Sequence, residues 1–96
     1  MRMGDWIMFR GTRRFLVGVR SHGCIMLERI QKGRFPSPCV HYSVGAKELS
    51  TITVIEQATP SSRRRARRLV EDSCSPWTRV VWHKGSDAPA YVHSPL

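Results

Sequence analysis

A chain of 96 residues, of which 41% are hydrophobic, is long enough for one small globular domain and too apolar to be an intrinsically disordered chain. Sixteen Lys and Arg against seven Asp and Glu give a net charge of +9, so a polyanion is the expected partner, with nucleic acid first. No apolar run approaches the roughly 20 residues needed to span a bilayer, so we expect no membrane partner.

The first half of the chain reads as five short strands. Residues 5–10 and 13–20 form the first two, joined by a turn in which Gly11 supplies a backbone conformation that other residues resist. Gly18 interrupts the apolar alternation of the second strand and predicts a bend or bulge there. The remaining predicted strands are residues 24–30, 39–44 and 51–56, with a single helical turn at residues 45–49 before the last.

This order of elements resembles the SH3-like barrel, in the group that includes KOW and Tudor modules. The likeness covers about residues 4–56 and is carried by Gly4-Asp5-Trp6-Ile7, Gly11, Val17-Gly18-Val19, Leu27-Glu28 and Gly45-Ala46-Lys47-Glu48-Leu49 leading into Ile52. The resemblance implies a small five-stranded barrel that binds RNA, DNA or peptides through its loops and open face. It assigns no individual binding residue.

The second half begins at a helix start signal. Thr59 is a good N-cap and Pro60 suits the first helical position, so a helix is predicted over residues 60–72. Residues 77–82 and 89–93 then form a predicted β-hairpin. The expected fold is therefore mostly β with one α-helix: an SH3-like barrel at 1–57, and a helix and hairpin at 58–96 that pack on the barrel or on a partner.

The predicted helix is basic and amphipathic. Its apolar stripe contains Ala66, Leu69 and Val70, and five arginines occupy the remaining arc: Arg63, Arg64, Arg65, Arg67 and Arg68. These arginines crowd the N-terminal half, against the helix dipole, which indicates that they serve a partner rather than helix stability. We expect contact with phosphates; a solvated face and a nuclear or nucleolar address are the alternatives.

Two loops extend the predicted binding surface. One carries Lys32, Arg34 and Phe35, a basic and aromatic set in which the ring is suited to stacking on a base. The other is the first turn, with Arg10, Arg13 and Arg14.

A zinc site and an enzyme active site are the alternatives to nucleic-acid binding. His22 and Cys24, and Cys39 and His41, are pairs at i and i+2, which place both side chains of a pair on one face of a strand, so a zinc site is possible if the two strands pair. The alternative for Cys24 is a small buried hydrophobic residue. No motif assembles a nucleophile, a base and an orienting acid, so we predict no enzyme and no cofactor.

A barrel-pore enzyme is the other comparison. Plasmid-type dihydrofolate reductases are small SH3-like barrels that assemble around a shared pore, and residues 40–44 lie where that family carries Val-Gln-Ile-Tyr. The Gln-Ile pair is absent from this chain.

The odd number of cysteines, Cys24, Cys39 and Cys74, and the lack of a signal-peptide pattern indicate a reducing, cytoplasmic location. The predicted function is a non-catalytic nucleic-acid-binding accessory protein with DNA or RNA as its partner. The alternatives are an adaptor or inhibitor that docks on an acidic protein, and a ribonucleoprotein subunit. The aromatic hairpin also allows a homo-oligomer.

Overall fold

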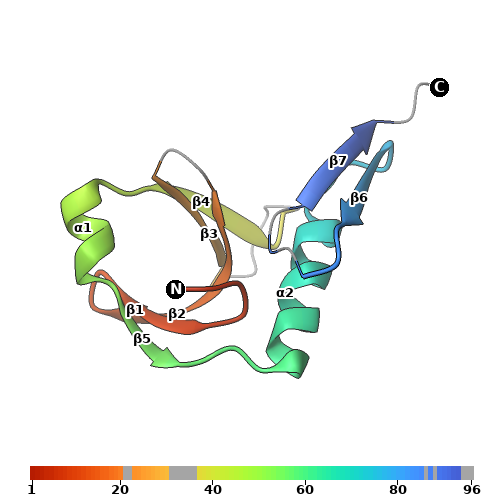
Figure 1. Cartoon of the computed structure of the whole chain (residues 1–96). Helices are drawn as coiled ribbons and strands as arrows, with labels where there is room; N and C mark the ends of the chain where they lie inside the picture. Colours follow the sequence, from red (N-terminus) through yellow and green to blue (C-terminus); the bar gives the residue numbers. More distant parts are fainter. Residues whose placement is uncertain (21–22, 31–36, 86, 88, 94–96) are drawn as a thin grey trace.

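The computed structural model describes residues 1–20, 23–30, 37–85, 87 and 89–93. Its elements follow the order β1 (Trp6–Phe9), β2 (Thr12–Arg20), β3 (Cys24–Glu28), β4 (Cys39–Ser43), α1 (Ala46–Thr51), β5 (Thr53–Glu56), α2 (Pro60–Asp72), β6 (Thr78–Trp82) and β7 (Pro89–His93). The mostly β fold expected from the sequence is confirmed, and each predicted element is present (Figure 1).

Five of the strands form one antiparallel sheet in the order β4-β3-β2-β1-β5. The register shifts between Leu16 and Gly18 where β2 pairs with β3, so the bulge predicted at Gly18 is confirmed. Figure 1 shows the sheet curled, with α1 joining its two edge strands. Among the described residues β4 and β5 do not pair with each other, so the sheet is not a closed barrel.

The tight turn between β1 and β2 has positive φ at both of its central residues, 49° at Arg10 and 78° at Gly11. Two such residues form a type I′ turn, whose twist matches that of the flanking strands. The turn brings Trp6 opposite Phe15 and fixes the register of the whole hairpin. It therefore places Arg10 in the turn itself, and Arg13 and Arg14 at the start of β2.

Two apolar clusters lie on opposite faces of the sheet. The inner cluster consists of Ile7, Phe9, Leu16, Ile25, Leu27 and Val44. The outer cluster lies under α2 and consists of Met3, Phe15, Val17, Met26, Cys39, Ala66 and Val70. Residues 25–27 of β3 are all buried, as expected for a strand inside the sheet with both faces covered.

Helix α2 begins with a capping box. The Thr59 hydroxyl accepts from the backbone N–H of Ser62, and the Ser62 hydroxyl accepts from the backbone N–H of Thr59. Pro60 at the first helical position and this reciprocal cap fix where the helix starts. Ala66 and Val70 then face the sheet and are buried, as the apolar stripe predicts.

A buried carboxylate ties the start of the chain to the start of α2. Asp5 is 4% exposed and accepts hydrogen bonds from the backbone N–H of Arg2 at 2.7 Å and of Ala58 at 2.6 Å. Gly4 lies against α2, because a Cβ at this position would come within 3.0 Å of the Arg63 nitrogen. The N-terminal segment thus closes one end of the interface between sheet and helix.

Strands β6 and β7 form a separate two-stranded sheet beside α2 (Figure 1). Val80 and Trp82 pack against the outer cluster, while Trp77 is 55% exposed. Within the described part of the chain, no helix has the length and apolar character needed to cross a membrane.

Candidate nucleic-acid interface

The five arginines of α2 divide into two groups once the helix is packed. Arg63 and Arg67 lie on the side of the hairpin: Arg63 pairs with Asp87, and the Arg67 guanidinium lies 5.3 Å from the centre of the Trp82 ring. Arg65 lies on the other side, where it pairs with Glu28 at 2.6 Å and covers the Phe15 ring at 4.4 Å. These three side chains are therefore held by the fold itself.

Arg64 and Arg68 form the second group. At about 100° per residue, both lie roughly 160° from Ala66 around the helix axis, and therefore face away from the sheet. Both are exposed and make no hydrogen bond, ion pair or ring contact with the described residues. They are one helical turn apart and form the outward pair of α2.

The arginines of the first turn are also engaged. Arg10 donates two hydrogen bonds to Glu48, at 2.9 and 3.0 Å, and lies over the rings of Phe9 and Tyr42. This bond raises the pKa of Arg10 and lowers the pKa of Glu48 below its usual value. Arg13 pairs with Glu56 at 3.1 Å and covers the Trp6 ring at 4.5 Å.

Arg14 is not displayed on the surface. It is 9% exposed, and its guanidinium donates to the Tyr42 hydroxyl at 3.4 Å and to the Glu28 carbonyl at 3.2 Å. Its Nε is buried without a hydrogen-bond partner among the described residues. Of the three predicted turn arginines, this one is the least able to reach a phosphate in the observed arrangement.

The remaining predicted contacts, Lys32, Arg34 and Phe35, lie outside the described residues.

Most of the carboxylates are engaged by partners within the fold. Six of the seven accept a hydrogen bond or form an ion pair within the fold, and Asp72 is the exception. The six are Asp5, Glu28, Glu48, Glu56, Glu71 and Asp87. The positively charged side chains thus outnumber the carboxylates that could pair with them, and this excess gives the net charge of +9.

The predicted zinc ligands are only partly brought together. Cys24 Sγ lies 3.9 Å from His41 Nδ1, but Cys39 pairs with Glu28, four residues along β3 from Cys24. At about 3.3 Å per residue this separation is near 13 Å, too far for one ion. His22 lies outside the described residues, within which no group of three or more His, Cys, Asp or Glu is placed to hold a metal ion.

Cys39 and His41 lie in different environments, and their pKa values are shifted in opposite directions. Cys39 is 4% exposed beneath α2, where its thiol donates to the Leu69 carbonyl and burial raises its pKa. Partial burial, followed by the charge of Arg20, lowers the pKa of His41. Cys39 therefore has the features of a buried structural cysteine, whereas Cys24, for which burial was the expected alternative, is half-buried.

Four residues that make these contacts were not identified as site residues from the sequence: Arg2, Arg20, Asp87 and Tyr91. Asp87 pairs with both Arg2 and Arg63, and the Tyr91 hydroxyl accepts from Arg20 at 3.0 Å. Arg2 and Arg20 are isolated cations in the sequence, and no local pattern marks them. Only the packing of the hairpin on α2 and β2 brings these groups together.

No protein-family model, no curated protein and no solved structure matches this chain.

Proposed function

We propose that this protein is a non-catalytic nucleic-acid-binding protein that contacts the phosphate backbone through the outward pair, Arg64 and Arg68. One observation carries the proposal: these two guanidinium groups are exposed and unpaired among the described residues, whereas the neighbouring arginines are held by the fold. Free guanidinium groups present the planar donor fork that suits phosphate oxygens.

The spacing of the pair supports the same reading. Four residues of α-helix rise about 6 Å, so both side chains lie on one face within reach of one strand of nucleic acid. The excess of positive charge would draw a polyanion toward this face, and the engaged carboxylates offer little competition.

The curled five-stranded sheet supports an SH3-like arrangement as part of the proposal. The strand order β4-β3-β2-β1-β5, with a short helix before the last strand, agrees with that architecture. Under this proposal the sheet is a scaffold that carries α2, and the binding chemistry lies on the helix.

The test is the double substitution Arg64→Gln and Arg68→Gln. We expect binding to DNA or RNA to weaken about tenfold at near-physiological salt, with a log–log salt slope smaller by about 2, because two phosphate contacts are lost. Fluorescence anisotropy at several salt concentrations measures both quantities. Stability should change by less than about 0.5 kcal/mol, because both side chains are exposed and make no hydrogen bond, ion pair or ring contact with the described residues.

A charge-matched control separates local contact from general attraction. Lys47 and Lys84 are exposed cations in α1 and in the hairpin turn, and their side chains make no hydrogen bond, ion pair or ring contact with the described residues. Lys47→Gln with Lys84→Gln removes the same total charge but keeps Arg64 and Arg68. This control should therefore change binding much less, because the outward pair is intact. Equal losses in the two double variants would show that only net charge matters.

An acidic protein partner is the alternative outcome. If no nucleic acid binds at near-physiological salt, while a stoichiometric acidic protein copurifies and is lost from the Arg64→Gln, Arg68→Gln variant, the same face serves an adaptor or inhibitor.

A further inference from the structure

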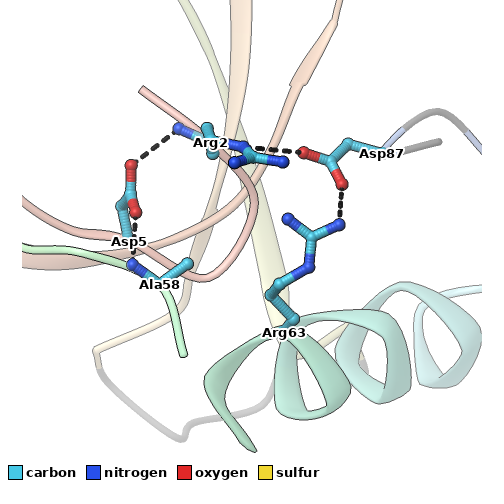
Figure 2. Close-up of polar contacts among 5 residues, drawn as sticks. All are labelled: Arg2, Asp5, Ala58, Arg63 and Asp87. Carbon is cyan, nitrogen blue, oxygen red and sulfur yellow. Dashed lines mark hydrogen bonds and ion pairs between the residues drawn. The ribbon is translucent and has the colours of Figure 1, made fainter. Parts of the chain in front are cut away.

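The hairpin engages four arginines of the rest of the chain. Asp87, between β6 and β7, lies between Arg2 and Arg63, as Figure 2 shows. The two further contacts involve rings: Trp82 lies beneath the Arg67 guanidinium at 5.3 Å, and Tyr91 beneath that of Arg20 at 5.6 Å.

These contacts have the chemistry of a nucleic acid. A carboxylate bound by two guanidinium groups occupies the place of a phosphate, and flat rings stacked on guanidinium groups occupy the place of bases. Arg63 and Arg67 belong to the same helix as the outward pair. The hairpin thus covers arginines that adjoin the proposed binding face.

The hairpin is less buried than the five-stranded sheet, although Val80 and Trp82 pack against the outer cluster and Trp82 Nε1 donates to Glu71 at 3.2 Å. No described residue of β6 or β7 is fully buried, and an isolated two-stranded hairpin is marginally stable in water. A small void of about 20 Å³ remains where Trp82, Pro89 and Tyr91 meet β2 and α2. Local opening is easiest for elements with few buried apolar contacts.

The contacts with Asp87 are also incomplete. Arg63 uses one of its nitrogens for the carboxylate, and Arg2 Nε is 3.9 Å from the other carboxylate oxygen, beyond hydrogen-bond range. The Arg67 Nε is buried without a hydrogen-bond partner among the described residues. Several donors are therefore available to a ligand richer in acceptor oxygens than one carboxylate.

We infer that the hairpin covers a second nucleic-acid-binding surface, made by the half-buried Arg63 and Arg67 with the exposed Arg2 and Arg20 at its edge, and that single-stranded nucleic acid displaces the hairpin. The inference rests on the proposed function and specifies its ligand. A single strand offers both free phosphates and the faces of unpaired bases, whereas a duplex keeps its base faces stacked on one another. The outward pair makes the first contact, and the covered arginines add theirs once the hairpin has moved.

The test compares Asp87→Asn with Asp72→Asn in the full chain. Both remove one negative charge, but Asp72 is exposed and makes no hydrogen bond or ion pair with the described residues. Asp87→Asn should tighten binding to a single-stranded oligonucleotide by about fivefold or more, because the covered surface becomes accessible in a larger fraction of molecules. Asp72→Asn should tighten it by less than about twofold, as expected for a screened surface charge.

Two further measurements examine the mechanism. In an Arg63→Gln background, Asp87→Asn should have no further effect, because the carboxylate has lost its main partner. Hydrogen exchange of the amides of β6 and β7 should speed up when the oligonucleotide is added, and duplex DNA of the same length should cause a smaller change.

The outcomes separate this inference from the proposed function. Equal effects of Asp87→Asn and Asp72→Asn, with hairpin exchange unchanged by the oligonucleotide, would overturn the covered surface while the Arg64 and Arg68 result stands. Absence of binding by every variant would overturn both.

Discussion

Replacing Phe15 with alanine is expected to reduce the free energy of unfolding by about 3–5 kcal/mol, the usual loss for a buried phenylalanine. Phe15 is 2% exposed and lies between the sheet and α2, where its ring meets the edge of Trp6 at a centroid distance of 5.1 Å. It also supports the guanidinium of Arg65. The substitution removes both contacts and leaves a cavity at the interface that positions the helix.

Urea denaturation followed by circular dichroism measures this loss. Small domains have only about 5–15 kcal/mol of stability, so a large fraction of the total is at stake. Phe15→Leu should cost less, about 1–2 kcal/mol, since much of the volume is kept. Ile55→Ala, at a side chain 46% exposed on β5, is the control and should cost under about 1 kcal/mol. A Phe15→Ala loss no larger than that control would show that α2 does not pack as described.

Gly23→Ala should destabilise the protein by about 3 kcal/mol, well beyond a matched glycine substitution in the other tight turn. Gly23 has a φ of 71°, and an added Cβ would lie 2.5 Å from the Val44 carbonyl oxygen. The left-handed conformation costs an alanine about 1 kcal/mol, and the clash with backbone adds to it because neither strand end can shift freely. Val44 N–H also donates to the Gly23 carbonyl, so a shift weakens that bond as well.

Gly11→Ala isolates the conformational part of this effect. Gly11 has a similar φ of 78°, but no atom lies within 4 Å of its added Cβ. Its cost should therefore stay near 1 kcal/mol. Thermal or urea unfolding of both variants gives the difference, and equal losses would indicate that the close approach of Gly23 to Val44 is absent in solution.

Local signals in the sequence were sufficient to predict the elements. The turn at Gly11, the bulge at Gly18 and the helix start at Thr59-Pro60 each depend on residues within a few positions of one another, and all three are present. The ends of the short helix were less accurate: a single turn was predicted at residues 45–49, and α1 runs to Thr51. Element ends depend on tertiary contacts that no local pattern contains.

The contacts of the arginines in α2 could not be predicted from local sequence signals. The helical period separates the apolar stripe from the basic arc, but it cannot tell which arginines meet a partner within the same chain. Arg65 is held by Glu28 and Phe15, which are 37 and 50 positions away in the sequence. Arg63 and Arg67 are held by a hairpin whose position on α2 follows from packing alone. Of the five predicted arginines, Arg64 and Arg68 are therefore the two that make no hydrogen bond, ion pair or ring contact with the described residues.

The zinc hypothesis also shows what a local sequence pattern cannot predict, in this case the register between two strands. The two strands pair as the hypothesis required, and this pairing places Cys24 near His41, but the register of β3 against β4 separates Cys39 from Cys24. Register depends on the whole sheet and on the loop that joins the strands.

The most direct test of the central claim is an anisotropy titration of the full chain with single-stranded DNA, duplex DNA and RNA of equal length, at low salt and at about 0.15 M salt. We predict binding that persists at the higher salt, favours a single strand, and weakens in the Arg64→Gln, Arg68→Gln variant more than in the Lys47→Gln, Lys84→Gln control. Weak binding that is equal for all three polymers, disappears at the higher salt and is the same in both variants would contradict this prediction.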